Sequence, residues 1–107
     1  VNEGADLWVL GLKTENDGPA LHASGGRTEI LGAFIYANSR RDKNPLFVLE
    51  GGAAFSVTMG ESSFRQKPFT QLVVETRSGE TRIVGREAAA RRGEGSAIGL
   101  FSTAAVP

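Results

Sequence analysis

Short apolar runs broken by glycine pairs recur along the chain at a constant spacing. The segment 19–26 (PALHASGG) resembles 45–52 (PLFVLEGG), with the prolines and the glycine pairs both offset by 26 residues (45 − 19 and 51 − 25), and a weaker third copy covers 71–79. At this offset, apolar residues fall into three columns: Leu21, Phe47 and Val73; Leu31, Val57 and Ile83; and Leu7, Ala33 and Met59. A unit this short cannot bury its own apolar face, so stacked units are expected to bury one another's.

Each unit consists of a strand, a Gly-Gly corner, a second strand and a polar loop. The loops are expected at 15–18, 38–44 and 65–68, where polar residues, glycine and proline gather. The strands between them are nearly continuous apolar runs, which favours parallel strands. We therefore predict an all-β fold, a right-handed parallel β-helix (β-solenoid) of about three to four coils over residues 1–85. A β-sandwich is the alternative, since short strands punctuated by glycine fit it too, but the constant offset favours the β-helix.

The C-terminal stretch 86–107 breaks the pattern and is predicted to be a capping segment. Arg86–Arg92 holds good helix formers but is too short to be a stable helix alone. Gly93–Ser96 ends it, and Ile98–Phe101 is expected to form a last strand or a cap. A solenoid needs such a cap, because its terminal coil otherwise exposes a strand edge and apolar surface.

Composition narrows the classes of function. The 107 residues suit one small domain, and 12 basic residues balance 12 acidic ones, which disfavours nucleic acid and membrane surfaces as partners. No apolar run is long enough to span a bilayer. With no cysteine and one histidine, a metal centre is not expected, and no glycine motif predicts a nucleotide cofactor. The start at Val1, without a signal-like segment, predicts a fragment whose partners are the upstream part of the same protein or neighbouring subunits.

A family resemblance rests on three stretches, 7–15 (LWVLGLKTE), 27–33 (RTEILGA) and 45–48 (PLFV). Together they resemble the C-terminal coils of bacterial proteins of the pectate-lyase-like β-helix superfamily, often grouped with glycoside hydrolases that include exo-β-1,3-glucanases. The resemblance covers about residues 5–85. It implies a right-handed parallel β-helix, a secreted, extracellular protein and a role connected with polysaccharide. It transfers no catalytic residue, because no catalytic motif of that superfamily matches a position here.

Candidate chemistry is sought among carboxylates and aromatic rings. Glycoside cleavage usually needs two carboxylates, and the candidates are Asp6, Glu15, Asp17, Glu29, Asp42, Glu50, Glu61 and Glu75. Glu50 shares a column with Ser24 and Thr76, so it is expected to project from a solenoid face, where a carboxylate is most often only solvated. The single histidine, His22, shares a column with Val48 and Val74, which favours a partly buried or interface position.

Aromatic rings can stack on the apolar face of a sugar, and the candidates are Trp8, Tyr36 and Phe64. Tyr36 precedes a loop whose Arg40 and Arg41 could hydrogen-bond hydroxyls or carboxylates. Trp8 lies in an apolar run, which favours a packed position. The predicted substrate-contacting residues are Tyr36, Arg40, Arg41, Trp8 and Glu50, with no catalytic residue in this chain.

These observations predict an accessory role in a carbohydrate-active β-helix protein. The chain would complete or cap the solenoid and contact polysaccharide. The alternative is a structural or assembly module that oligomerises through solenoid edges and has no catalytic activity.

Overall fold

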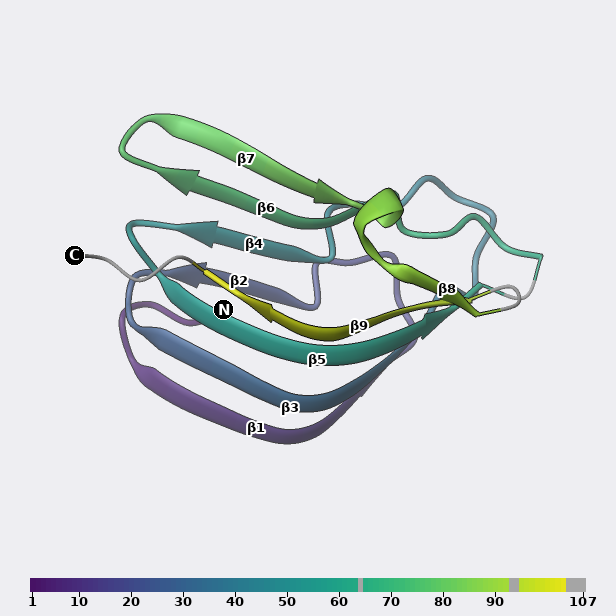
Figure 1. The fold of residues 1–107 in the computed structure, drawn as a ribbon, viewed down its shortest axis with the longest axis horizontal. Helices are drawn as coiled ribbons and strands as arrows, with labels where there is room; N and C mark the ends of the chain where they lie inside the picture. The colour runs from purple at the N-terminus through teal and green to yellow at the C-terminus, as the bar shows by residue number, and fades with distance from the viewer. Residues whose placement is uncertain (64, 93–94, 104–107) are drawn as a thin grey trace.

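The chain is all-β and folds into two open sheets that face each other across one apolar core (Figure 1). The computed structural model describes residues 1–63, 65–92 and 95–103. The larger sheet has the strand order β1-β3-β5-β9-β8 and the smaller one β2-β4-β6-β7. The strands are β1 (Asp6–Thr14), β2 (Leu21–Ser24), β3 (Arg27–Tyr36), β4 (Phe47–Glu50), β5 (Ala54–Ser62), β6 (Gln71–Arg77), β7 (Glu80–Gly85), β8 (Ala90–Arg92) and β9 (Gly95–Ser102).

Strands β1 to β6 form two parallel ladders. In the larger sheet β1, β3 and β5 pair in parallel, and in the smaller sheet β2, β4 and β6 do the same. The chain alternates between the ladders, so each pass adds one strand to each sheet. The predicted column Leu21, Phe47 and Val73 is confirmed, because Leu21 pairs with Phe47 and Phe47 with Val73.

The last third of the chain pairs differently. A two-residue turn at Ser78 and Gly79, both with positive φ (51° and 80°), reverses the chain so that β7 runs antiparallel to β6. Positive φ at both central residues is the geometry of tight hairpins that match the strand twist. Strand β9 then returns antiparallel along β5, and β8 pairs with β9. Both sheets are therefore mixed, and they do not form a solenoid.

The glycine pairs form the corners where the chain crosses from the smaller sheet to the larger one. Gly25, Gly26, Gly51 and Gly52 all have positive φ, which residues with a side chain rarely adopt. Gly26 is also sterically constrained, because a Cβ atom there would lie 2.4 Å from the carbonyl oxygen of Ala5. The corner of one pass thus packs directly on the corner of the previous one.

A bulge in the larger sheet overturns two of the predicted columns. Gly32 has a φ of 77°, and both Leu31 and Gly32 face outward, so Ile30 and not Leu31 pairs with Val57. Ile83 lies in the other sheet and is exposed. The column Leu31, Val57 and Ile83 is therefore wrong. In the third column Ala33 does pair with Met59, but Leu7 pairs with Thr28.

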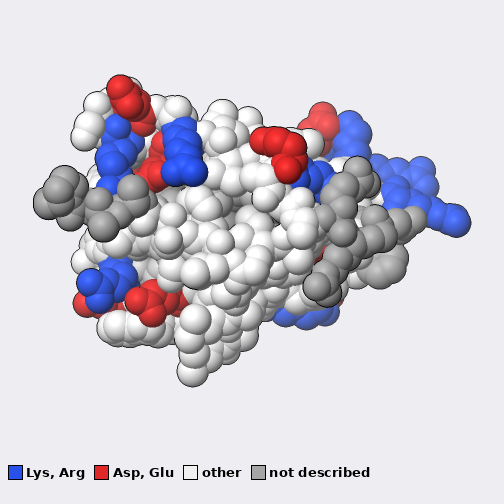
Figure 2. Space-filling model, viewed as in Figure 1, with Lys and Arg blue, Asp and Glu red and all other residues white. Residues whose placement is uncertain are grey.

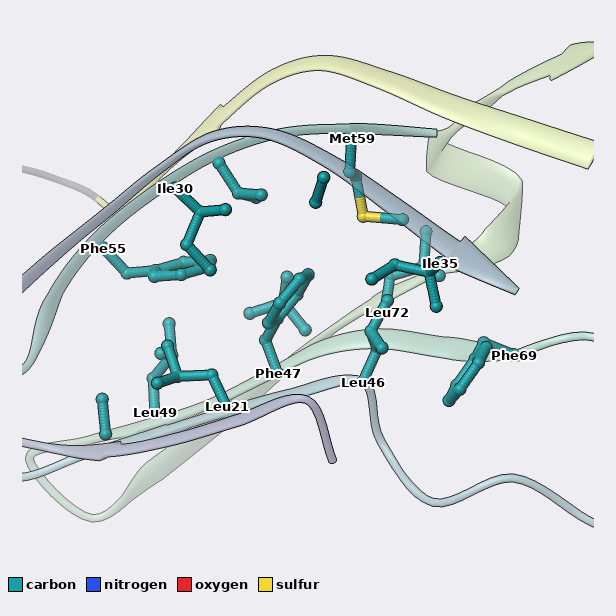
Figure 3. Packing of buried hydrophobic residues seen from close by; sticks show 14 of the residues in the cluster. Leu21, Ile30, Ile35, Leu46, Phe47, Leu49, Phe55, Met59, Phe69 and Leu72 are labelled. Atoms are coloured by element: carbon teal, nitrogen blue, oxygen red, sulfur yellow. The ribbon is translucent and has the colours of Figure 1, made fainter. Parts of the chain in front are cut away.

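The core lies between the sheets and is filled by the inward residues of both. In β5 the alternation is regular, with Phe55, Val57 and Met59 facing inward. Phe47 of the smaller sheet meets Phe55, with ring centroids 5.1 Å apart (Figure 3). Burial of each large apolar side chain contributes roughly 1.5–3 kcal/mol to stability, so these residues supply most of the force that holds the sheets together.

The C-terminal segment contains little helix. Only Arg86–Ala88 form a single 3-10 turn, η1, after which β8 begins. Helix propensity in 86–92 therefore loses to strand pairing with β9. Ile98–Phe101 lie within a strand, β9, as expected.

Candidate functional site

The most distinctive surface is the free edge of β1, because in the part of the chain that the structure describes no strand pairs with its outer side. The strand is nine residues long and carries charges only near its ends, at Asp6 and Lys13. Long apolar edge strands are templates for pairing with another chain, and soluble proteins usually blunt them with charges, proline or a covering element. This edge has little such protection.

The apolar interior is also accessible at this end of the molecule. Leu7, Val9 and Leu12 are the inward residues of β1, and they are only partly buried. Their partners in β3, by contrast, are almost fully buried: Thr28 is 0%, Ile30 1% and Ala33 7% exposed. The core therefore continues to the surface beneath β1.

Asn2 holds the corresponding edge of the smaller sheet. It makes an isolated parallel bridge with Ala23, in which Asn2 N–H donates to the His22 carbonyl at 2.8 Å and Ser24 N–H donates to the Asn2 carbonyl at 2.8 Å. Its side chain is buried and donates from Nδ2 to Ala5 O at 3.0 Å and to Thr28 Oγ1 at 2.8 Å. Asn2 and β1 thus form a rudimentary first coil with the same corner as the later ones.

The opposite end of the stack is closed by antiparallel strands. Strand β9 covers the edge of β5, and β7 covers the edge of β6. Glu61, at the inner face of β5, fixes this closure: its Oε2 accepts hydrogen bonds from Arg86 Nη1 at 2.6 Å and from Ser96 Oγ at 2.9 Å. The Glu61 side chain has no exposed surface. One carboxylate therefore joins β5, β9 and the turn that follows β7.

A second feature is a charged cavity of about 320 Å³ at the β6–β7 hairpin, lined by Glu75, Arg77, Ser78, Glu80, Thr81 and Arg82. The cross-strand register places Glu75 opposite Arg82 and Arg77 opposite Glu80, so charges of opposite sign alternate. Arg77 Nη2 lies 2.9 Å from Glu75 Oε1. In Figure 2 the charged side chains gather at this hairpin and at the far end, with a largely uncharged surface between them. The cavity offers donors and acceptors in balance and attracts neither simple cations nor simple anions.

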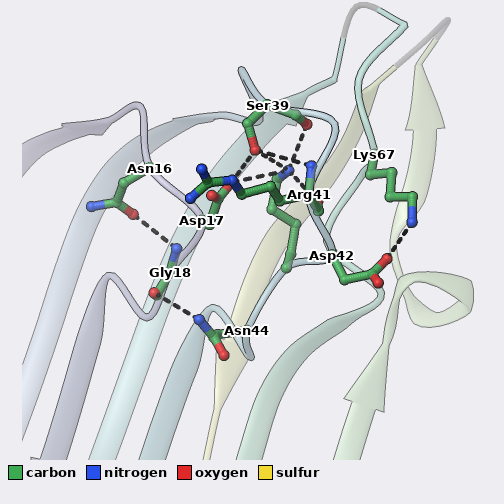
Figure 4. A network of polar contacts seen from close by, with 9 residues as sticks. Asn16, Asp17, Gly18, Ser39, Arg41, Asp42, Asn44 and Lys67 are labelled. Atoms are coloured by element: carbon green, nitrogen blue, oxygen red, sulfur yellow. Dashed lines mark hydrogen bonds and ion pairs between the residues drawn. The ribbon is translucent and has the colours of Figure 1, made fainter.

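A polar cluster organises the loops that follow β1 and β3 (Figure 4). The buried Lys43 ammonium donates to the Ser39 carbonyl at 2.7 Å and to the Arg41 carbonyl at 2.9 Å, and lies 3.1 Å from Asp17 Oδ1. The hydrogen bond from Ser39 Oγ, and next the Lys43 ammonium, hold the pKa of Asp17 below its usual value.

A separate contact ties the loop after β3 to the loop after β5. Asp42 Oδ1 accepts a hydrogen bond from Lys67 Nζ at 2.5 Å, and this bond lowers the pKa of Asp42. All of these loop charges are satisfied by one another, so we assign the cluster a structural role.

The predicted substrate-contacting residues do not converge on one site. Trp8 lies at the start of β1 on the outer face of the larger sheet, whereas Tyr36 is the last residue of β3 and therefore lies at the other end of that sheet. Arg40 and Arg41 are exposed in the following loop. Glu50 is exposed on the smaller sheet, where it lies 3.2 Å from His22 Nε2. Phe64 lies outside the described residues.

Two expectations about single side chains have clear outcomes. Trp8 is 56% exposed, so the prediction that it packs is wrong: the run 7–12 alternates in and out of the core, and Trp8 takes an outward position. His22 is partly buried, as expected, because it faces outward beside Glu50.

Sequence reasoning missed the free edge of β1, the Glu61 junction and the charged hairpin. The signal for the hairpin was present, since Ser78-Gly79 between two strand-like runs is a typical two-residue loop. Glu61 could have been suspected as the fourth inward position of an alternating strand, 54–62. The edge of β1 had no local signal, because only the strand order reveals which strand is outermost.

Comparison with known proteins adds no relative. No family model matches the chain, and neither the curated proteins nor the solved structures contain a significant match. The likeness to pectate-lyase-like proteins thus rests on the sequence cadence alone. Among the described residues no helix is long and apolar enough to cross a membrane, and no group of three or more metal-ligating side chains is found.

Proposed function

We propose that the chain is a terminal module that closes one end of a longer stack of parallel β-strands. The observation that carries this proposal is the difference between its two ends: antiparallel strands cover the last parallel strands β5 and β6, while β1 presents a free apolar edge above a partly exposed core. A stack of parallel coils needs such a cap at its end, and further coils at the other side. The module is structural and has no catalytic task of its own.

In this proposal the two parallel ladders are the last coils of a parallel β-helix, and the free edge of β1 continues into preceding coils. The predicted membership of an extracellular, carbohydrate-active β-helix protein is consistent with this arrangement. Its support remains the sequence resemblance.

The test is to supply one more coil. Asn2 pairs with Ala23 and Asp6 pairs with Arg27, which is the same separation of 21 residues. A variant in which residues 2–22 are repeated in tandem directly before Asn2 therefore adds a coil of matching geometry. We expect amide hydrogen exchange in β1 to slow by about tenfold or more, because its outer N–H groups become bonded. A variant with the same added residues in shuffled order is the control, and equal exchange rates in both variants would refute the proposal.

A second candidate is contact with polysaccharide through the outer face of the larger sheet. The observation that favours it is the row of exposed apolar and aromatic side chains there, with Trp8 56% and Phe34 45% exposed on neighbouring strands. Flat, amphipathic rings on a rigid sheet suit stacking on a sugar ring. Electrophoresis in gels containing soluble β-1,3-glucan tests this. We expect the glucan to retard the chain, Trp8→Ala to abolish the retardation, and Leu100→Ala on the same sheet to preserve it. Unretarded migration of the parent chain would contradict it.

A further inference from the structure

The spacing of inward residues in β1 limits what can pair with its edge. Leu7, Val9 and Leu12 face inward, with gaps of two and then three residues, because Gly11 adopts a φ of 74° and adds an outward position. Strand β3 has the same gaps in Thr28, Ile30 and Ala33, around Gly32. The two strands consequently pair without interruption, and each inward residue of β1 has an inward partner in β3.

The pairing of β3 with β5 shows what happens when the gaps differ. Strand β5 alternates regularly, and its register with β3 shifts between Ile30 and Ala33. The N–H of Gly32 then donates to a side chain, Thr58 Oγ1, at 2.9 Å. A mismatch of one residue is therefore tolerated, but it interrupts the ladder of backbone hydrogen bonds.

A second copy of this chain is a poor occupant of the edge. In an antiparallel pair of two β1 strands the order of the gaps reverses, so gaps of two and three meet gaps of three and two, and two opposite register shifts are needed within one short strand. A head-to-tail arrangement also fails in the larger sheet, because the edge at its other end is β8, which has only three residues. Apolar side chains placed on the wrong face would meet water, and register is strongly selected for that reason.

We infer that the edge of β1 is built for a parallel coil whose inward side chains follow the same gaps of two and three, with a left-handed residue beside Gly11. Such a coil would continue both ladders at once, along β1 in one sheet and along Asn2 in the other. Its inward side chains are apolar, because they cover Leu7, Val9 and Leu12. This inference rests on the proposed function and specifies the partner that the terminal module accepts.

The experiment compares two versions of the tandem variant with residues 2–22 repeated. One carries the repeat unchanged, and the other has Gly11→Val in the inserted copy alone, where a β-branched residue disfavours positive φ. We expect exchange in β1 to slow about tenfold or more in the first and less than about twofold in the second. If both slow it equally, the required spacing is wrong while the proposed function stands. If neither slows it, the proposed function fails.

Sedimentation of the parent chain tests the choice of occupant. We expect a monomer across the concentration range used for exchange. A dimer in which β1 amides become protected as concentration rises would show that a second copy occupies the edge, and would overturn the inference.

Discussion

Arg86 and Glu61 bind the end of one sheet to the other. Arg86 follows the last strand of the smaller sheet, Glu61 lies on the inner face of the larger one, and Arg86 Nη1 donates a hydrogen bond of 2.6 Å to Glu61 Oε2. The carboxylate side chain is fully buried and the guanidinium is 19% exposed. Since Ser96 of β9 donates to the same oxygen, this contact holds the antiparallel strands that close the stack.

Glu61→Gln should therefore destabilise the fold. Loss of the charge leaves the largely buried Arg86 guanidinium without its carboxylate, and we expect unfolding free energy to fall by about 2–4 kcal/mol. Chemical denaturation measures the change. Glu15→Gln, at an exposed carboxylate that pairs with Lys13, is the matched control and should cost less than about 1 kcal/mol. Equal costs for the two substitutions would show that the buried contact does not stabilise the closed end.

The Asn2–Thr28 hydrogen bond should couple the first corner to β3. Asn2→Ala leaves buried polar groups unpaired and is expected to cost about 1–3 kcal/mol. Because Asn2 Nδ2 bonds Thr28 Oγ1 directly, a double-mutant cycle with Thr28→Val should give a coupling energy of about 0.5–1.5 kcal/mol. Additive effects in denaturation experiments would show that the two side chains do not interact.

Two corner glycines separate steric constraint from backbone strain. Gly26 and Gly52 have similar φ values, 68° and 73°, but a Cβ atom at Gly26 would lie 2.4 Å from Ala5 O, whereas nothing lies within 4 Å of one at Gly52. Gly52→Ala should cost about 1–2 kcal/mol through strain alone. Gly26→Ala should cost clearly more, and thermal unfolding of both variants provides the comparison. A Gly26→Ala variant as stable as Gly52→Ala would contradict the close stacking of successive corners.

The Asp17 carboxylate should contribute to stability in a pH-dependent way. Its pKa is lowered from 3.8 by the Ser39 hydrogen bond and then by Lys43. Because the folded state holds the proton less tightly than the unfolded state, the contribution is complete above about pH 3.8 and is lost as the pH falls through the lower pKa of the folded chain. Ser39→Ala should raise the pKa of Asp17 toward 3.8, as measured by carbon NMR titration of the carboxyl. Ser102→Ala is the control, and an unchanged Asp17 pKa in Ser39→Ala would refute the assignment.

The sequence predicted the parallel part of the fold where nothing disturbs the spacing. The units that contain Leu21 and Phe47 have equal lengths, so the offset of 26 residues matches the strand register. It failed at Leu31, because the left-handed Gly32 adds one outward residue and shifts every later position relative to β5. It failed again beyond Ser78, where the turn reverses the chain and a continued offset no longer describes neighbouring strands.

The candidate site was less predictable than the fold. Trp8 and Tyr36 were chosen by residue type, but they lie at opposite ends of the same sheet, because strands β1 and β3 run parallel. Glu50 projects from the other sheet altogether. The free edge of β1 depends on the order of strands within the sheet, which is set by contacts distant in sequence.

Amide hydrogen exchange on the unmodified chain tests the central claim most directly, namely that one end of the stack is free and the other closed. We predict that β1 amides exchange fastest among the long strands, that those of β3 and β5 exchange slowest, and that β9 is better protected than β1. Protection of β1 equal to that of β3, or exchange in β9 faster than in β1, would contradict the account.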